Sequence, residues 1–264
     1  DSCITKGYTS CIKKKCIKNS MLKSVLGYIE KKYYDLHKMF CKIDCIISPS
    51  EFNKNQLLKG KLKCNDITVI HNFVNETEKT DYTLGDCAFY FGRLSREKGI
   101  LNLVEAINNI PGARLIIAGD GPERENIQAY IKEHKLENRI TLLGYLNQND
   151  IRENIRKCRF VTVPSICFEN CPYSVLEAME IGKPIIGSKI GGIPELVKDD
   201  VNGYTYAYDC VDDLTDKLKI LFENDEKVNE FSNNSKRLYK ENYSAETYYN
   251  KLMTVYNKYI NTDK

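Results

Sequence analysis

Residues 160–178, FVTVPSICFENCPYSVLEA, form the segment that best indicates the fold of this chain. Residues 160–163 are an apolar run rich in β-branched side chains, which predicts a buried strand. A loop bounded by prolines follows, and residues 173–181 predict a helix that Gly182 ends. A buried strand, a loop and a helix in this order make one unit of an α/β sheet.

The same unit is repeated along the chain on both sides of this segment. Strands are predicted at residues 87–91, 114–118, 140–143 and 184–187. Helices are predicted at residues 97–109, 122–134 with Pro122 in its first turn, 148–157, briefly at Pro194, and at 211–223, 226–239 and 245–260. This alternation predicts a parallel sheet covered by helices on both faces.

Residues 1–72 form a smaller part of the chain. An amphipathic helix at 21–43, a strand at 45–48, a helix at 51–59 and a strand at 67–70 are predicted there. These elements are too few for a complete sheet, so we expect a partial second α/β domain. Residues 73–86 are polar and aperiodic, which predicts a linker between the two parts.

Composition excludes several classes of protein. The chain has 264 residues, of which 42% are hydrophobic and 28% charged, too apolar for a disordered protein. No apolar run approaches the roughly 20 residues of a spanning helix. Residues 1–80 carry 15 Lys and Arg against 8 Asp and Glu, whereas the rest carry 24 against 28. Such an uneven charge argues against a uniform nucleic-acid-binding surface and favours a basic patch near the start.

The chain holds eleven cysteines but neither a Cys-x-x-Cys nor a His-Glu-x-x-His motif. We interpret them as reduced thiols that behave as small hydrophobic side chains. The alternative for Cys3, Cys11 and Cys16 is a remnant of a four-cysteine metal site whose first ligand preceded Asp1. Three ligands do not close a structural site, so no metal is predicted.

Ligands of open parallel sheets bind beyond the carboxyl ends of the strands, so the loops there are the candidate site. The loop 92–99 places Arg93 and Lys98 beside a helix start, an arrangement suited to phosphate. A solvated basic turn explains the same residues equally well. The loop 118–122 contains Gly-Asp-Gly but lacks the third glycine of a dinucleotide fingerprint, because Arg124 occupies that position.

The loop that follows residue 163 is the richest in chemistry. It carries Glu169, and Glu177 stands eight positions later in the predicted helix. Carboxylates at such a place accept hydrogen bonds from sugar and ribose hydroxyls, and free amides at a helix start hold phosphate or sugar oxygens. The glycines of loop 191–195 allow close backbone approach and should face this loop. We expect the turns at 92–98 and 169–177 to converge on one ligand.

Residues 91–195 resemble the donor-binding domain of the retaining glycosyltransferases of family 4, which have the GT-B fold. The resemblance is carried by GRLSREKG (92–99), AGDGP (118–122), LGY (143–145), PSICFENCPYSVLEA (164–178), GKP (182–184) and GGIPE (191–195). It implies a Rossmann-like parallel sheet at residues 76–245. It further implies that residues 1–75 are the truncated end of an acceptor-side domain and that helix 246–264 crosses back to that domain.

The same resemblance implies a role for each site residue. Arg93 and Lys98 would hold the nucleotide diphosphate, and Glu169 would contact the hydroxyls of the donor sugar, so these three are the catalytic candidates. Glu177 would bind the ribose. The other implied donor contacts are Gly92, the base-side stretch Gly144, Tyr145 and Leu146, and the residues Asn170, Cys171, Tyr173, Ser174 and Val175. Asn170, Cys171 and Pro172 replace glycines that are frequent in the family, and proline donates no amide.

The function implied is transfer of a hexose from a UDP- or GDP-sugar to a glycan or lipid-linked acceptor, with retention of configuration. No Asp-x-Asp pair is present, so metal-independent chemistry without a cofactor is expected. The family's acceptor-side loop and catalytic-site histidine would lie upstream of Asp1, so we expect this chain alone to bind donor without normal turnover. The expected location is the cytoplasm, with a role in polysaccharide biosynthesis and no nucleic-acid partner. For the basic helix 21–43 two readings stay open, packing within the N-terminal domain and a peripheral contact with anionic lipid at the inner membrane face.

Two other hypotheses remain open at the level of sequence. The chain could be a non-catalytic nucleotide- or sugar-binding module, or a scaffold that uses its cysteine-rich front. It could also be a nucleotide-dependent oxidoreductase, although the missing third glycine disfavours that class. Nucleotide binding tests the oxidoreductase hypothesis, because an oxidoreductase prefers NAD to UDP- or GDP-sugars, and the complete upstream sequence tests the binding module.

Overall fold

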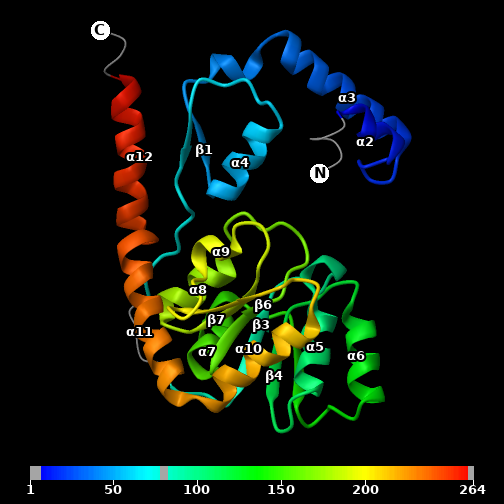
Figure 1. Cartoon of the computed structure of the whole chain (residues 1–264), viewed down its shortest axis with the longest axis vertical. Helices are drawn as coiled ribbons and strands as arrows, with labels where there is room; N and C mark the ends of the chain where they lie inside the picture. The colour runs from blue at the N-terminus through cyan, green and yellow to red at the C-terminus, as the bar shows by residue number, and fades with distance from the viewer. Residues whose placement is uncertain (1–6, 78–82, 261–264) are drawn as a thin grey trace. The chain divides into compact units, whose positions relative to one another are not determined.

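The computed structural model describes residues 7–77 and 83–260, which divide into two compact units. The smaller unit comprises Asp1–Ile70 with Leu252–Lys264, and the larger unit comprises His71–Lys251. Figure 1 labels the helices and strands of both units. The division falls a few residues from the boundaries expected after 75 and 245, because the residues after Ile70 are held by the larger unit, as shown below.

A single six-stranded parallel sheet forms the centre of the larger unit. Its strands are β3 (Cys87–Phe91), β4 (Arg114–Ala118), β5 (Ile140–Gly144), β6 (Phe160–Val163), β7 (Ile185–Ser188) and β8 (Gly203–Tyr206). They lie in the order β5-β4-β3-β6-β7-β8, and every neighbouring pair is parallel. The chain therefore starts in the middle of the sheet and extends it first to one edge and then to the other.

Helices cover both faces of this sheet, as predicted (Figure 1). Successive residues of β3 point to opposite cores, with Ala88 and Tyr90 in one and Cys87 and Phe89 in the other. The first core is covered by α5 (Ile100–Asn108), α6 (Arg124–Glu133) and α10 (Val211–Glu223), and the second by α7 (Gln148–Lys157), α8 (Tyr173–Ile181) and α9 (Ile193–Leu196). Helix α11 (Asp225–Asn242) contributes side chains to both.

Strand β8 was not among the predicted strands. It is short, and it begins with Gly203, a residue that is depleted in strands. The glycine is needed there because a Cβ at Gly203 would lie 1.8 Å from the carbonyl oxygen of Ile185 on β7. The close approach of the two backbones therefore requires glycine at this position, where strands usually have a β-branched residue.

Two predicted helices begin later than expected. The helix at 97–109 is split into a 3-10 turn, η2 (Arg96–Lys98), and α5, because Gly99 between them has a left-handed φ of 65°. Helix α6 begins at Arg124 and not at Pro122. Gly121 has a φ of 156° and lies against the backbone of Leu94, and the Arg124 amide donates to the Gly121 carbonyl at 3.1 Å, so Pro122 belongs to a turn ahead of α6.

The smaller unit contains a two-stranded parallel sheet. Its elements are α2 (Thr9–Lys13), α3 (Met21–Leu36), η1 (Met39–Lys42), β1 (Ile46–Ser48), α4 (Glu51–Lys59) and β2 (Ile67–Val69). Helix α12 (Ala245–Ile260) ends in this unit, where Lys258 Nζ lies 2.7 Å from Asp66 Oδ2. The predicted helix 21–43 stops at Leu36, because Lys38 takes a left-handed φ of 48°.

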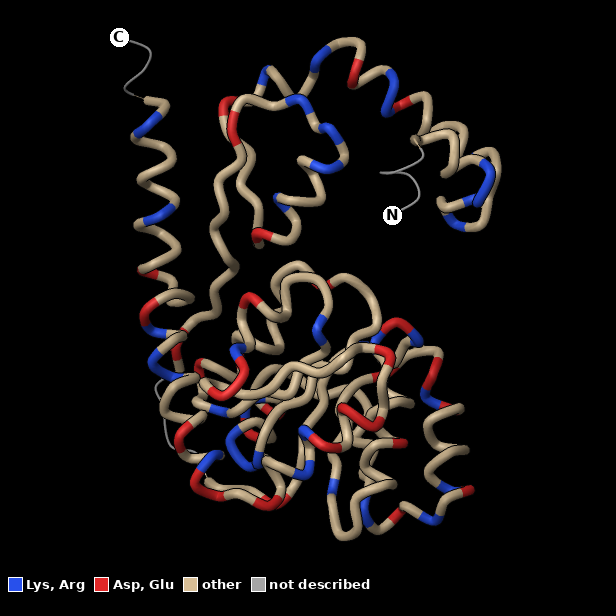
Figure 2. The backbone as a smooth tube through the Cα atoms, in the orientation of Figure 1, with Lys and Arg blue, Asp and Glu red and all other residues tan. Residues whose placement is uncertain are grey.

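Helix α3 presents its apolar face to solvent. Leu22 and Leu36 are 71% and 79% exposed, and Leu26, Ile29 and Tyr33 between them are also exposed. On the other side of the helix Ser24 is fully covered, and Val25, Tyr28 and Tyr34 are half-buried. Lys13 ends α2, and Lys14, Lys15 and Lys18 follow it, which makes a basic segment (Figure 2). The unit thus combines this basic segment with an uncovered apolar stripe on α3.

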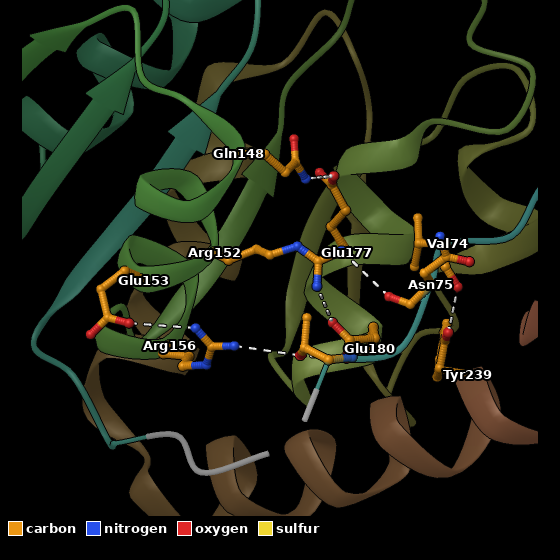
Figure 3. A network of polar contacts seen from close by, with 10 residues as sticks. Val74, Asn75, Gln148, Arg152, Glu153, Arg156, Glu177, Glu180 and Tyr239 are labelled. Atoms are coloured by element: carbon orange, nitrogen blue, oxygen red, sulfur yellow. Dashed lines mark hydrogen bonds and ion pairs between the residues drawn. The ribbon is translucent and has the colours of Figure 1, made fainter. Parts of the chain in front are cut away.

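The described part of the predicted linker, residues 73–77 and 83–86, contains no helix or strand but is fastened to the larger unit (Figure 3). The Tyr239 hydroxyl donates to the buried Val74 carbonyl at 2.6 Å. The Thr77 amide and hydroxyl donate to Glu180 Oε1 at 2.8 and 2.9 Å, and Arg152 lies 3.5 Å from Glu180 Oε2. Because both Tyr239 and Glu180 are buried, this segment is an integral part of the fold.

We expect Tyr239→Phe to lower the free energy of unfolding by about 1–3 kcal/mol, because it leaves the buried Val74 carbonyl without its donor. Tyr249→Phe is the matched control, since Tyr249 is 59% exposed. Denaturant unfolding of both variants measures the difference. Equal stability of the two variants would show that the Tyr239 hydroxyl does not hold the segment.

Candidate functional site

The loops that follow β3, β4, β5, β6 and β7 gather at the carboxyl edge of the sheet. The loop after β3 and the loop after β6 are in direct backbone contact there. The Ile166 amide donates to the Glu97 carbonyl at 2.9 Å, and a Cβ at Gly99 would lie 2.1 Å from the Pro164 carbonyl oxygen. The two turns that we expected to converge therefore meet.

Lys98 and Glu169 form an ion pair at this meeting point. Lys98 Nζ lies 2.5 Å from Glu169 Oε1, and the buried Ser165 hydroxyl donates to the same oxygen at 2.8 Å. Both charged side chains are partly accessible to solvent. The arrangement places a cation and an acceptor-only carboxylate within reach of one bound molecule.

The pair influences the groups around it. Burial raises the pKa of the Tyr90 hydroxyl, and the charges of Glu169 and Glu97 add to the effect. Burial, together with the charge of Glu169, also raises the pKa of the Cys167 thiol. Both groups are therefore neutral at physiological pH, and the charges of the site are those of its lysine, arginine and carboxylate residues.

The loop after β7 contacts the backbone of Glu169, and it faces the loop after β6 as expected. The Gly192 amide donates to the Glu169 carbonyl at 2.6 Å. Gly191 has a left-handed φ of 63°, and a Cβ there would lie 2.3 Å from the same carbonyl oxygen. Only a glycine permits the two backbones to approach so closely, so this contact fixes where the Glu169 carboxylate stands.

A cavity of about 350 Å³ opens beside the loop after β3. It is lined by Gly92, Arg93, Ala118, Gly119, Asp120, Tyr145, Leu146 and Ile151. Tyr145 is 81% exposed and offers a flat apolar ring to a ligand. Gly144 closes β5 with a φ of 72°, and its carbonyl accepts the Gly119 amide at 2.7 Å.

The cavity brings together four of the predicted residues, Gly92, Arg93, Tyr145 and Leu146. Arg93 is exposed, and its carbonyl accepts hydrogen bonds from the Tyr90 hydroxyl at 2.9 Å and the Ser95 amide at 3.1 Å, while its guanidinium makes no hydrogen bond or ion pair with a described residue. Its guanidinium is thus available to an anion. Asp120 and Ile151 also line the cavity but were not predicted.

The residues at the start of α8 differ in what they can offer. Cys171 and Val175 are buried in the core, so their side chains cannot reach a ligand. The Val175 amide donates to the Pro172 carbonyl at 3.2 Å, and its donor contact stays a prediction. The amides of Tyr173 and Ser174 have no acceptor among the described residues, and Asn170 is exposed.

Glu177 lies in the second turn of α8, the helix that follows the Glu169 loop. Its Oε1 accepts a hydrogen bond from Gln148 Nε2 of α7 at 2.5 Å (Figure 3). Burial raises the pKa of its carboxyl, while the bond from Gln148 and the charge of Arg152 act in the opposite direction. Gln148 was not predicted from the sequence, because its partner stands 29 residues away.

His71 and Asn72, at the start of the larger unit, are attached to the loops of the site. His71 Nε2 lies 3.2 Å from Glu195 Oε2, and its ring meets the Tyr243 ring edge-on at 5.5 Å. Asn72 Nδ2 donates to the Cys171 carbonyl at 3.2 Å. These contacts attach His71 to Glu195 of α9 and to Tyr243 after α11.

Over residues 7–77 and 83–260, no group of three or more His, Cys, Asp or Glu is arranged to hold a metal ion. Cys3, one member of the front cysteine cluster, lies outside the described residues. Cys16 is exposed and forms no disulfide with a described residue. The alternative of a metal site formed by Cys3, Cys11 and Cys16 stays a hypothesis.

Comparison with known proteins agrees with this geometry. The sequence is 32% identical over 200 residues to the uncharacterized glycosyltransferase MJ1178 of Methanocaldococcus jannaschii, covering 75% of this chain and 55% of that protein. It is 27% identical over 234 residues to the O-antigen chain mannosyltransferase C of Escherichia coli, covering 82% of this chain and 61% of that one. The chain thus spans a little over half the length of these relatives.

Solved structures share the fold. The complex of Anabaena HepE with UDP matches with a TM-score of 0.75 and 23% identity, over 81% of this chain and 64% of that one. Sucrose-phosphate synthase from Thermosynechococcus elongatus matches with a TM-score of 0.75 and 20% identity, over 85% and 60% of the two chains. The profile of the family "Glycosyl transferases group 1" matches residues 75–238, and the chain therefore belongs to this GT-B glycosyltransferase family.

Proposed function

We propose that this chain contains the donor site of a retaining, metal-independent hexosyltransferase that uses a UDP- or GDP-sugar. The acceptor proposed is a glycan or a lipid-linked sugar. The observation that carries the proposal is the contact between Lys98 and Glu169, at 2.5 Å, beside the cavity that Arg93 and Tyr145 line. A diphosphate, a sugar and a base need these three kinds of partner: cations, a hydroxyl acceptor and an aromatic surface.

The chemistry proposed follows from the charge that develops during transfer. When the glycosidic bond breaks, negative charge grows on the leaving diphosphate. Cations that are already in place stabilise that charge more in the transition state than in the ground state, which accelerates the reaction. Lys98 and Arg93 take this role in the proposal, and it asks nothing of a metal ion.

Glu169 orients the sugar in this proposal. Its carboxylate accepts hydrogen bonds from donor hydroxyls, and Ser165 and Gly192 hold it in position. The amides of Tyr173 and Ser174 bind sugar or phosphate oxygens. The acceptor attacks from the face that the leaving group occupies, so the anomeric configuration is retained and Glu169 is not required to be a nucleophile.

The rest of the enzyme is proposed from the relatives. Because the chain spans little more than half of them, we propose that it binds donor without normal turnover. The alternative activity, nucleotide or sugar binding without catalysis, uses the same site. We place the protein in the cytoplasm at the inner membrane face, supported by the basic residues of 1–80, which favour anionic lipid. None of the described helices is long and apolar enough to cross a bilayer.

Calorimetric titration of the 264-residue chain with UDP, GDP, UDP-glucose, GDP-mannose and NAD tests the proposal. We expect a uridine or guanosine diphosphate ligand to bind more tightly than NAD by at least about 1.4 kcal/mol, which is tenfold. The position of Arg124, where a dinucleotide site needs glycine, is the reason. A preference for NAD would overturn the proposal in favour of an oxidoreductase.

Donor binding should also depend on pH through Glu177. Burial raises the pKa of this carboxyl, and a ribose contact needs the ionised acceptor. Affinity for UDP or GDP therefore decreases as the pH falls through that raised pKa, by up to about tenfold per pH unit. Glu177→Gln is the control, because it lacks this step but keeps the titration of the diphosphate itself. Identical pH profiles for both proteins would remove Glu177 from the site.

A further inference from the structure

Gln148 and Glu177 come from two helices that begin at the ligand-binding edge of the sheet. Gln148 is the first residue of α7, directly after Asn147, whose side chain caps the helix by accepting the Asp150 amide at 3.0 Å. Glu177 lies one turn into α8. The cap and the packing of both helices on the same core hold the two side chains in register, and Gln148 Nε2 reaches Glu177 Oε1 at 2.5 Å (Figure 3).

The contact stands next to the cavity. Ile151, which lines the cavity with Arg93 and Tyr145, is three residues after Gln148 and therefore on the same face of α7. The Gln148 side chain therefore lies between the residues that line the cavity and the Glu177 carboxylate. The neighbouring Asn149 is exposed, and no contact with Glu177 is found for it.

Only one oxygen of Glu177 is engaged in the described part of the chain. Oε1 accepts the bond from Gln148, and no donor within residues 7–77 or 83–260 reaches Oε2. Arg152 is close enough for its charge to lower the pKa of Glu177, but its guanidinium is turned to Glu180, 3.5 Å away. The carboxylate is therefore held at one oxygen and open at the other.

We propose that Gln148 is a positioning residue for the nucleotide ribose: its side-chain amide fixes one oxygen of Glu177 so that the other faces the 2′,3′-diol. The inference rests on the proposed function, in which Glu177 binds the ribose. A neutral amide suits this task, because it donates a hydrogen bond and leaves the negative charge of Glu177 available to the hydroxyls. Fixing the carboxylate before the ligand arrives removes the loss of side-chain freedom from the binding step.

The test compares UDP with 2′,3′-dideoxyuridine diphosphate on the 264-residue chain, or the guanosine pair if the chain prefers GDP. The measured quantity is the ratio of the two dissociation constants, which reports the diol alone. We expect Gln148→Met, which has similar length but no donor, to reduce this ratio about three- to tenfold, as for one lost hydrogen bond. Asn149→Ala is the matched control and should keep the wild-type ratio.

Glu177→Ala separates the two levels of the proposal. If this variant keeps the wild-type ratio, the ribose contact in the proposed function is wrong. If the ratio falls in Glu177→Ala but keeps its wild-type value in Gln148→Met, the proposed donor site stands and the proposed role of Gln148 is wrong. A second readout is the pH profile of binding, because loss of the Gln148 bond moves its acidic limb to higher pH. A merely structural role of Gln148 leaves that limb in place.

Discussion

The Lys98→Ala variant is expected to bind its nucleoside diphosphate more weakly by about 1.5–3 kcal/mol, which is about 10- to 150-fold. The ammonium group supplies a charged hydrogen bond to the diphosphate in the proposed function. Its loss also leaves Glu169 without its cation, so that a bare carboxylate stands beside the ligand's negative charge. Calorimetric titration of wild type and variant with UDP or GDP measures the effect.

Arg96→Ala is the matched control for this experiment. Arg96 belongs to the same 3-10 turn as Lys98 and is exposed, but it does not line the cavity that contains Arg93. It removes one positive charge from the same loop without touching the Lys98–Glu169 pair. If both variants lose the same affinity, the effect is one of general charge, and Lys98 has no specific place in the site.

The Gly191→Ala variant is expected to lose both stability and donor affinity. A left-handed φ costs a residue with a Cβ about 1–2 kcal/mol. The new methyl group would in addition lie 2.3 Å from the Glu169 carbonyl oxygen, and the backbone shift that relieves this overlap costs about 1–3 kcal/mol more. Because the shift moves the loop that carries Glu169, affinity for the intact nucleotide sugar should fall together with the thermal unfolding midpoint.

Gly112→Ala supplies the comparison. Gly112 has a similar left-handed φ of 79°, but a Cβ there would meet nothing within 4 Å. It should therefore show only the conformational cost and keep full donor affinity. A Gly191→Ala protein that matches Gly112→Ala in both measurements would show that the loop after β7 does not position Glu169.

The sequence predicted the parts of the fold that have strong periodic signals. Helix α8 was predicted with its observed bounds, and the strands β3 and β4 likewise, because each is a continuous apolar run or a clear helical pattern bounded by glycine or proline. Strand β8 was missed because its signal, Tyr-Thr-Tyr after a glycine, is only three residues long. The break at Gly99 was missed because a left-handed residue inside an apolar pattern becomes visible only when its neighbour, the Pro164 carbonyl, is known.

The site residues likewise divide into those that the sequence predicted and those that it did not. Charged residues in strand-end loops, such as Lys98 and Glu169, are recognisable from sequence because topology brings the loops to one edge. Ser165 could have been found as well, since it stands four residues before Glu169 in the same loop. Gln148 could not, because its role depends on how α7 packs against α8, which no local pattern encodes.

The ion pair between Lys98 and Glu169 affects how tightly a free nucleoside diphosphate or a free sugar binds, compared with the intact nucleotide sugar. In the unliganded protein each charge satisfies the other, so arrival of the donor is an exchange of partners. A free nucleoside diphosphate pairs with Lys98 but gives Glu169 no hydrogen-bond donor in exchange. A free sugar donates to Glu169 but gives Lys98 no anion in exchange. An intact nucleotide sugar supplies a new partner to both residues at once, so its diphosphate and its sugar should bind cooperatively. The nucleoside diphosphate product should therefore dissociate more readily than the intact donor.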